Sequence, residues 1–228
     1  VFHDIYNFKQ SLFLISILGK NIKIYITPRG AFSPVALNRS FIKKKLYYLI
    51  FVKPFINYID AFIALNENEL NYIYNFTSKK TIIMPNGVHD NYKNYIKNIE
   101  NYDLKEKSID INIGFLGRFD VFIKGLDDLL EAYVDFQKRN EKIKINLIFI
   151  GSHSKNNEFN SKKYFDKIKK ILINPESFII KGPLYEEKKW LELSKLDILI
   201  QPSRTEGMPN TVLEAMSMGI PCCVTKET

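Results

Sequence analysis

Residues 201–224, QPSRTEGMPNTVLEAMSMGIPCCV, decide the fold predicted for this chain. They begin at the end of a short apolar run, residues 198–201, of the kind that forms a buried parallel strand. Good helix formers fill residues 210–218, and Gly219 with Pro221 ends this helix before the next apolar strand. The residues that break regular structure between strand and helix are Pro202, Ser203 and Gly207. The order strand, loop, helix, strand predicts one unit of a parallel α/β sheet.

Two carboxylates, Glu206 and Glu214, stand in this unit with seven residues between them. Pro209 suits the first position of the helix, because its fixed φ and missing N–H cost nothing there. Glu206 is therefore expected in the loop and Glu214 in the early turns of the helix. Such a loop lines the ligand crevice of a parallel sheet, and the free N–H groups of a helix start favour anions. This arrangement suits a sugar attached to a diphosphate, and two acids that merely complement the helix dipole are the simpler alternative.

The stretch also matches a known signature in order and spacing, through the elements Pro202-Ser203, Glu206, Glu214-Ala215-Met216 and Gly219-Ile220-Pro221. This pattern resembles that of the retaining glycosyltransferases of family 4, which have the GT-B fold: two Rossmann-like domains with parallel sheets facing a cleft. The resemblance implies that Glu206 contacts the donor sugar and Glu214 the ribose of the nucleotide. The other donor-binding residues that it implies here are Gly207, Met208 and Asn210. Pro209 replaces a glycine common in the family and has no N–H to donate.

A second group of candidate residues follows the apolar run at residues 111–116, which predicts the first strand of the second domain. Gly117, Arg118 and Lys124 come between this strand and a helix expected from about residue 125 to 139, where both cations would reach a diphosphate. Two surface cations are the alternative. The family that the chain resembles has Gly-Arg, a short gap and Lys-Gly at this point. The resemblance thus implies that Arg118 and Lys124 stabilise the leaving diphosphate while Glu206 orients the sugar.

Two further contacts depend on the same resemblance. The family places the nucleobase against the loop that here consists of Lys181, Gly182, Pro183 and Leu184. Arg29 stands in the loop after the strand predicted at residues 22–27, where many members carry a histidine that faces the donor sugar. An arginine there would bind a phosphate or an acidic sugar bidentately, touch the acceptor, or simply lie in solvent.

The chain is long enough for two small α/β domains. We predict a partial N-terminal, acceptor-side Rossmann-like domain at residues 1–89 and a C-terminal nucleotide-sugar-binding domain at 111–228. The polar residues 90–110 read as the interdomain connection, a hinge that would let the cleft open and close. Because the sequence starts at Val1 and stops just after a predicted strand, we interpret it as a fragment with both domains incomplete.

The net charge of +8 permits an anionic membrane surface, an acidic substrate or nucleic acid as partner. Nucleic acid is not expected, since the sequence has no helix-turn-helix, zinc-finger spacing or RNP-type aromatic motif. His3, His89 and His153 are far apart and show no metal-ligand spacing. We expect no metal and no cofactor, because Arg118 and Lys124 would neutralise the diphosphate. The adjacent Cys222-Cys223 pair suits a reduced cytoplasm and small core positions.

Residues 40–58 predict a helix that carries basic side chains beside aromatic and aliphatic ones. The basic residues are Lys43, Lys44 and Lys45. Such a helix lies on an anionic membrane surface, or its charges form an ordinary solvated face. The sequence has no secretory signal, and its apolar runs are too short to span a bilayer. We therefore expect a cytoplasmic protein at the inner face of the plasma membrane.

The function predicted from these residues is the transfer of a sugar from a nucleotide-sugar to the hydroxyl of a glycan or lipid-linked acceptor, with retained anomeric configuration. The resemblance implies a role in cell-surface polysaccharide or lipopolysaccharide biosynthesis, and chemistry that consists of positioning and diphosphate stabilisation. A sugar-nucleotide epimerase of the same fold is one alternative and would need further acid and base residues near the cleft. A non-catalytic fragment that binds sugar nucleotides is the other.

Overall fold

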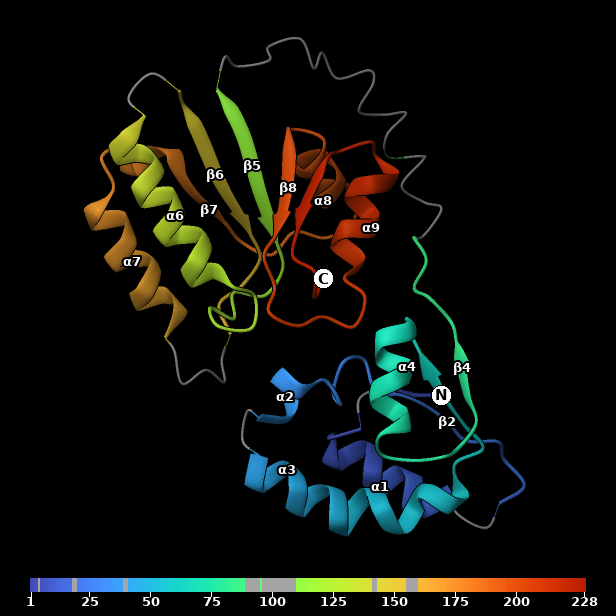
Figure 1. Cartoon of the computed structure of the whole chain (residues 1–228). Helices are drawn as coiled ribbons and strands as arrows, with labels where there is room; N and C mark the ends of the chain where they lie inside the picture. Colours follow the sequence, from blue (N-terminus) through green and yellow to red (C-terminus); the bar gives the residue numbers. More distant parts are fainter. Residues whose placement is uncertain are drawn as a thin grey trace. The chain divides into compact units, whose positions relative to one another are not determined.

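The computed structural model divides by its contacts into two compact units (Figure 1). Unit 1 comprises Val1–Asn86 with Thr205–Met208, and unit 2 comprises Gly87–Arg204 with Pro209–Thr228. The residues that the structure describes are 1–3, 5–17, 20–38, 41–88, 95, 110–140, 143–154 and 160–228. The predicted connection at 90–110 lies outside them, except for Tyr95 and Asp110. The predicted domains, 1–89 and 111–228, are continuous segments of the sequence, unlike the two units, and they stay predictions.

Unit 1 contains a parallel sheet in the order β1-β2-β3-β4. Its strands are β1 (Phe2–His3), β2 (Tyr25–Thr27), β3 (Ala61–Ala64) and β4 (Thr81–Ile83). Its α-helices are α1 (Phe8–Ile17), α2 (Pro34–Asn38), α3 (Phe41–Tyr47) and α4 (Glu67–Tyr74). All four residues of β3 are buried, as expected for a strand covered on both faces. The core of unit 1 gathers around Phe32, Phe62 and Ile73.

The helix predicted for residues 40–58 changes its type along its length. After α3 the chain is π-helical over Tyr48–Val52 and 3₁₀-helical over Lys53–Tyr58. Pro54 explains why no α-helix continues through the last of these turns, since it has no N–H to donate to the carbonyl four residues before it and its ring clashes there. Helix α2 was not predicted, although Pro34 at its first position is a known start signal.

Unit 2 contains a parallel sheet in the order β7-β6-β5-β8-β9 (Figure 1). Its strands are β5 (Ile111–Leu116), β6 (Ile145–Ile150), β7 (Phe178–Lys181), β8 (Ile198–Gln201) and β9 (Cys222–Val224). Its α-helices are α6 (Leu126–Arg139), α7 (Ser161–Ile171), α8 (Glu186–Leu193) and α9 (Asn210–Ser217). With parallel sheets and interleaved helices in both units, the predicted α/β class is confirmed.

Helices cover both faces of the unit 2 sheet, with α6 and α7 on one side and α8 and α9 on the other (Figure 1). The alternation of side chains along β6 shows how one strand supplies both cores. Leu147 and Phe149 pack with α6 and α7, whereas Ile148 and Ile150 pack with α8 and α9. Five of the six residues of β6 are apolar, with Asn146 as the exception, as expected for a central strand covered on both faces.

The strand order of unit 2 has a switch point between β5 and β8. From the central strand β5 the chain moves outward through β6 and β7, then returns to the other side of β5 with β8 and β9. The loops after β5 and β8 therefore leave neighbouring strands in opposite directions. In open parallel sheets this is the place where ligands bind, outside the carboxyl ends of the strands.

The bounds of β5 and β8 are those predicted, and one prediction beside them is wrong. Pro209 is the N-cap of α9, with extended backbone angles of φ −75° and ψ 115°, and the helix begins at Asn210. The carbonyl oxygen of Pro209 accepts a hydrogen bond from the Val212 N–H at 3.2 Å. Gly219 ends this segment as expected, with a left-handed φ of +74°.

Candidate functional site

The loop after β5 is anchored by hydrogen bonds to the end of β6 and to the loop that follows it. Gly117 N–H donates to the Ile150 carbonyl at 2.9 Å, and Phe119 N–H donates to the Ser152 carbonyl at 2.8 Å. Arg118 lies between these two anchored residues and is exposed. Within the described ranges it has no ion-pair partner. The fold thus fixes the backbone of Arg118 at the end of the central strand and leaves its guanidinium accessible.

Lys124 lies in the turn that joins this loop to α6 and is half-buried. Its N–H donates to the Asp120 carbonyl at 2.9 Å. Gly125 follows as the N-cap of α6 with a left-handed φ of +60°, and a Cβ there would lie 2.0 Å from the Pro202 carbonyl oxygen. Only glycine fits at this contact. The Lys124 turn is therefore pressed against the loop that follows β8.

Arg204, which the sequence analysis did not select, locks these two loops together. Its N–H donates to the Ile123 carbonyl at 2.9 Å. Its guanidinium contacts the first turn of α6, with Nη1 at 2.7 Å from Asp127 Oδ1 and Nη2 at 2.6 Å from Asp128 Oδ2. The hydrogen bond that Arg204 donates to Asp127 is the main reason why the pKa of Arg204 is raised. No spacing rule connects Arg204 with acids in a distant helix, which is why this contact was not predicted.

Glu214 lies in α9, as predicted, and it forms an ion pair with Lys189 of α8. Lys189 Nζ is 2.8 Å from Glu214 Oε1, and the two side chains are only 20% and 17% exposed. Lys189 Nζ also lies 4.5 Å from the centroid of the Trp190 ring. Trp190 itself is buried and belongs to the core. The sequence offered no sign of Lys189, because no spacing rule connects two separate helices.

The predicted nucleobase loop leaves β7 at the same edge of the sheet. Lys181 ends the strand and pairs with Glu192 of α8, which also accepts from Lys195 at 2.8 Å. Burial raises the pKa of Glu192, but the hydrogen bonds from the two lysines outweigh it and hold that pKa below its ordinary value. Beyond Lys181, Gly182 and Pro183 are exposed, and Leu184 packs against the core beside Trp190.

In unit 1, Arg29 lies in the turn after β2, as predicted, and is exposed. Its φ of +52° is unusual for a residue other than glycine and costs roughly 1 kcal/mol. The turn is fixed by Glu69, which is 2% exposed. This carboxylate accepts from Gly30 N–H at 2.5 Å and from Leu65 N–H at 2.7 Å. Glu69, which sequence reasoning missed, therefore determines the backbone geometry at Arg29.

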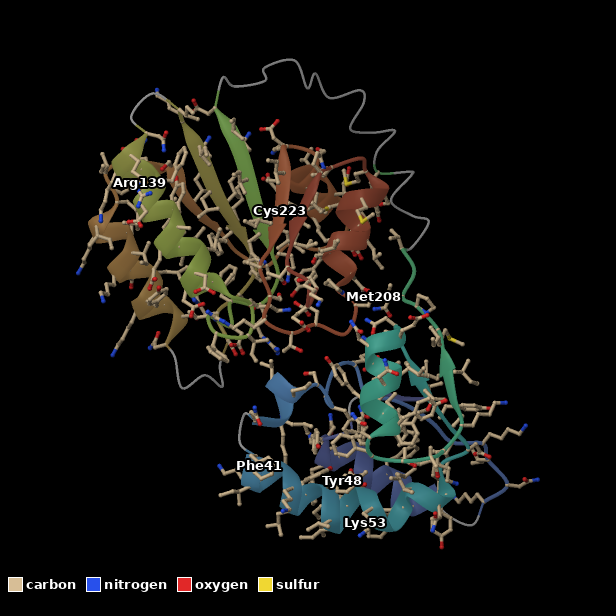
Figure 2. All side chains as sticks on the ribbon, in the orientation of Figure 1. Phe41, Tyr48, Lys53, Arg139, Met208 and Cys223 are labelled. Atoms are coloured by element: carbon tan, nitrogen blue, oxygen red, sulfur yellow. The ribbon has the colours of Figure 1, made fainter. Side chains whose placement is uncertain are left out.

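The residues Thr205–Met208 are also fixed by polar contacts within unit 1. Asn66 caps α4 and donates from Nδ2 to the Gly207 carbonyl at 2.6 Å. Asn86 donates from Nδ2 to the Met208 carbonyl at 2.9 Å (Met208 is labelled in Figure 2). A Cβ on Gly207 would lie 3.2 Å from the carbonyl carbon of Arg29, so these two predicted residues are neighbours. Glu206, beside Gly207, is half-buried.

Two kinds of feature are absent from the described ranges. In them, no helix has the length and apolar character needed to cross a bilayer. Nor do three or more histidine, cysteine or acidic side chains gather there in a way suited to a metal ion. Cys222 is half-buried and Cys223 exposed, and both are free thiols.

Comparison with known proteins identifies the family of this chain. The family model of the glycosyl transferases group 1 matches residues 110–228. Protein CapJ of Staphylococcus aureus is 30% identical over 133 residues, which are 55% of this chain and 31% of CapJ. The O-antigen biosynthesis glycosyltransferase WclY of Escherichia coli is 29% identical over 173 residues, 72% of this chain and 42% of WclY. The chain thus spans less than half the length of these relatives.

Solved structures share the fold. Sucrose-phosphate synthase of Thermosynechococcus elongatus superposes with a TM-score of 0.69 at 16% identity, over 91% of this chain and 51% of that one. Anabaena HepE, solved in complex with UDP-glucose, gives a TM-score of 0.67 at 15% identity, over 96% of this chain and 57% of HepE. These neighbours are GT-B glycosyltransferases, so the predicted GT-B fold is confirmed. Since the family match covers more than half of its 228 residues, this chain belongs to the glycosyl transferases group 1 family.

Proposed function

We propose that the protein is a retaining glycosyltransferase of family 4, which moves a sugar from a nucleotide-sugar donor to an acceptor hydroxyl. The observation that carries this proposal is the switch point of unit 2, where Arg118 and Lys124 follow β5 at the ligand-binding edge of the sheet. The family match over residues 110–228 supports it. So does the UDP-glucose named in the complex of the structural neighbour HepE.

Each candidate residue has one role in the proposed reaction. Arg118 and Lys124 stabilise the diphosphate as the bond to the sugar breaks, with Gly117 giving its backbone room to approach. Glu214 accepts hydrogen bonds from the ribose, and Glu206 orients the sugar and faces the positive charge that develops on it. The remaining donor contacts come from Gly207, Met208 and Asn210, with the base against Lys181, Gly182, Pro183 and Leu184. Arg29 binds the donor sugar or the acceptor.

We propose that this chemistry needs no divalent metal. A metal in such enzymes would neutralise the diphosphate, and two cationic side chains at the end of β5 supply the same charge. Neither Arg118 nor Lys124 has to change its protonation state during the reaction. The protein then contributes fixed positive charge and position to the reaction, without a cofactor of its own.

The acceptor that we propose is a glycan or a lipid-linked sugar in cell-surface polysaccharide or lipopolysaccharide biosynthesis. The name of the relative WclY, an O-antigen biosynthesis glycosyltransferase, supports this context. An acceptor on a lipid carrier would be reached at the cytoplasmic inner face of the plasma membrane. Unit 1 has a surface suited to that place, since α3 carries the exposed residues Phe41, Ile42, Lys43 and Lys45.

The two carboxylates provide the test, because their proposed roles separate in kinetics. Glu214→Gln should weaken the binding of the free nucleoside diphosphate by roughly tenfold to a hundredfold, the range for one hydrogen bond to a charged group. Glu206→Gln should keep that affinity and lower kcat by roughly a hundredfold or more, since its contact strengthens in the transition state. Calorimetry and steady-state kinetics on both variants measure these effects.

Glu187→Gln is the matched control, because Glu187 is an exposed acid of α8 and the same charge is removed. It should behave as the wild type in both assays. If Glu206→Gln loses nucleotide affinity while Glu214→Gln loses only kcat, the two roles are reversed. If neither variant changes either quantity, residues 201–224 do not bind the donor and the proposal is wrong.

A further inference from the structure

The carboxylate proposed for the ribose is already half of an ion pair. Glu214 of α9 uses Oε1 for Lys189 of α8, at 2.8 Å, and both side chains are more than three-quarters covered. The two helices lie on the same face of the unit 2 sheet and share one apolar core (Figure 1). Lys189 is held from a second side by the Trp190 ring, whose centroid is 4.5 Å from Nζ. The cation therefore has one fixed position beside the carboxylate.

Stability alone is a weak reason for this pair. Taking two charges out of water costs nearly as much as their attraction returns, and apolar residues of similar size often stabilise a fold equally well. The core that α8 and α9 share is apolar and includes Leu193 and Ala215, so the packing of the two helices does not depend on this ion pair alone. A functional reason has to lie in what Lys189 does to Glu214.

Lys189 affects Glu214 in two ways that matter for a nucleotide. It occupies Oε1 and so fixes the rotation of the carboxylate, while Oε2 forms no hydrogen bond among the described residues. It also balances the negative charge. A bare carboxylate near the ribose would repel the diphosphate attached to that ribose, and in a covered site this repulsion is strong. A carboxylate paired with a lysine accepts from hydroxyl groups without that penalty.

We propose that Lys189 is a positioning residue of the donor site. It holds the Glu214 carboxylate in one orientation and balances its negative charge. Glu214 can then accept hydrogen bonds from the ribose hydroxyls of an anionic nucleoside diphosphate. This inference rests on the proposed function of Glu214. It adds that ribose recognition depends on a cation from a different helix, α8.

The experiment compares Lys189→Met with Lys188→Met, an exposed lysine one position away in the same helix. Calorimetry measures the affinity for UDP, GDP and ADP and for their 2′-deoxy forms. Lys189→Met should weaken the binding of the preferred ribonucleotide by about tenfold, the scale of one charged hydrogen bond. It should also reduce the preference for the ribonucleotide over its deoxy form. Lys188→Met should change neither, and Lys189→Arg should retain most of both.

A double-mutant cycle separates positioning from a structural effect. Because Lys189→Met leaves Glu214 unpaired in a covered place, the double variant Lys189→Met/Glu214→Gln removes that charge as well. If Lys189 acts through Glu214, the double variant binds no more weakly than Glu214→Gln alone. If the two losses add in full, Lys189 does not act through Glu214.

The remaining outcomes distinguish this inference from the proposed function. If Glu214→Gln reduces both the affinity and the preference for ribose while Lys189→Met changes neither, the role of Lys189 is overturned and the donor site stands. A loss of thermal stability in Lys189→Met with an unchanged ribose preference also overturns it, because a purely structural pair behaves in that way. If the wild type binds none of the three nucleotides, the proposed function falls and the role of Lys189 falls with it.

Discussion

At the scale of single residues, Arg118 and Lys124 differ in how the fold holds them. Arg118 is exposed between two anchored backbone positions, whereas Lys124 is half-buried in a turn closed against Pro202. Both are placed by backbone contacts to neighbouring loops. The backbones that carry the two charges are therefore fixed before a ligand arrives, which favours the electrostatic stabilisation that we propose for the leaving diphosphate.

Replacing either cation by alanine should lower the rate of sugar transfer by roughly a hundredfold to a thousandfold, the scale for losing one preorganised donor. The matched controls are Arg139→Ala and Lys138→Ala, since both are exposed near the end of α6 (Arg139 is labelled in Figure 2). Initial rates with and without EDTA measure both this effect and the proposed independence from metal.

Unchanged turnover in both the Arg118 and the Lys124 variant would remove the diphosphate role from this pair. Activity that is lost in EDTA and restored by Mg²⁺ or Mn²⁺ would show that a metal supplies the charge. In that case the two cations are insufficient, even if each variant is also impaired.

At this scale, the sequence predicted the site residues that a local pattern marks and missed those whose role depends on a partner distant along the chain. Arg118 and Lys124 were found because a strand and a helix start, both readable from local pattern, enclose them. Lys189, Arg204 and Glu69 were missed, because their partners are brought near only by the fold. An ion pair between α8 and α9 leaves no periodic trace in either helix.

At the scale of elements, Glu192 ties α8 to the end of β7. Its pKa is held below the ordinary value of 4.5 by Lys181 and Lys195, against the opposing effect of burial. A carboxyl with a lowered folded pKa contributes stability that is present above its unfolded pKa and lost as the pH falls through the folded one. The tie between α8 and β7 should therefore weaken only in acid.

Glu192→Gln should lower the free energy of unfolding at pH 7 by roughly 1 kcal/mol, a figure reduced for partial exposure to solvent. It should also flatten the fall of stability below about pH 4.5, the unfolded value. Urea unfolding at several pH values measures both effects. Glu131→Gln, an exposed acid of α6, is the control and should keep the wild-type dependence. An equally steep acid dependence in Glu192→Gln would contradict the assignment.

Elements were predictable where a single pattern dominated. β5 and β8 are short apolar runs bounded by turn residues, and their predicted bounds match the structure. The π-helical and 3₁₀-helical turns after α3 were not predictable, because hydrophobic periodicity does not distinguish helix types near a proline. Pro209 was misplaced by one position, since a first-turn proline and an N-cap proline look alike in sequence.

At the scale of the whole molecule, the net charge is +8, and the exposed surface of α3 carries part of this positive charge. Phe41, Ile42 and Leu46 are each more than half exposed, with Lys43 and Lys45 exposed among them (Phe41 is labelled in Figure 2). Lys44 behaves differently from the prediction for the three lysines, since its ammonium donates to the Ala36 carbonyl within unit 1. The basic face therefore reduces to Lys43 and Lys45.

Lys43→Glu/Lys45→Glu should reduce binding to vesicles that contain anionic lipid by at least roughly tenfold, since each basic residue near such a surface contributes about 1 kcal/mol. Co-sedimentation with phosphatidylserine-containing and purely zwitterionic vesicles measures this. Lys20→Glu/Lys23→Glu makes the same charge change elsewhere on unit 1, at two exposed lysines, and should have a much smaller effect. Binding that ignores the anionic lipid content, or that survives the first double change, would rule the proposal out.

The strand order of unit 2 also has a consequence for biosynthesis. β5 pairs with β8 through Ile113 with Ile198 and Gly114 with Leu199, positions far apart along the chain. As the nascent chain leaves the ribosome, β5, β6 and β7 can associate early, while one edge of β5 stays open to unwanted strand pairing. Arg204 and Glu214 emerge only with or after β8. In the proposed function, donor binding thus depends on residues that are synthesised after β5, β6 and β7, so a nucleotide cannot act as a template for these early folding steps.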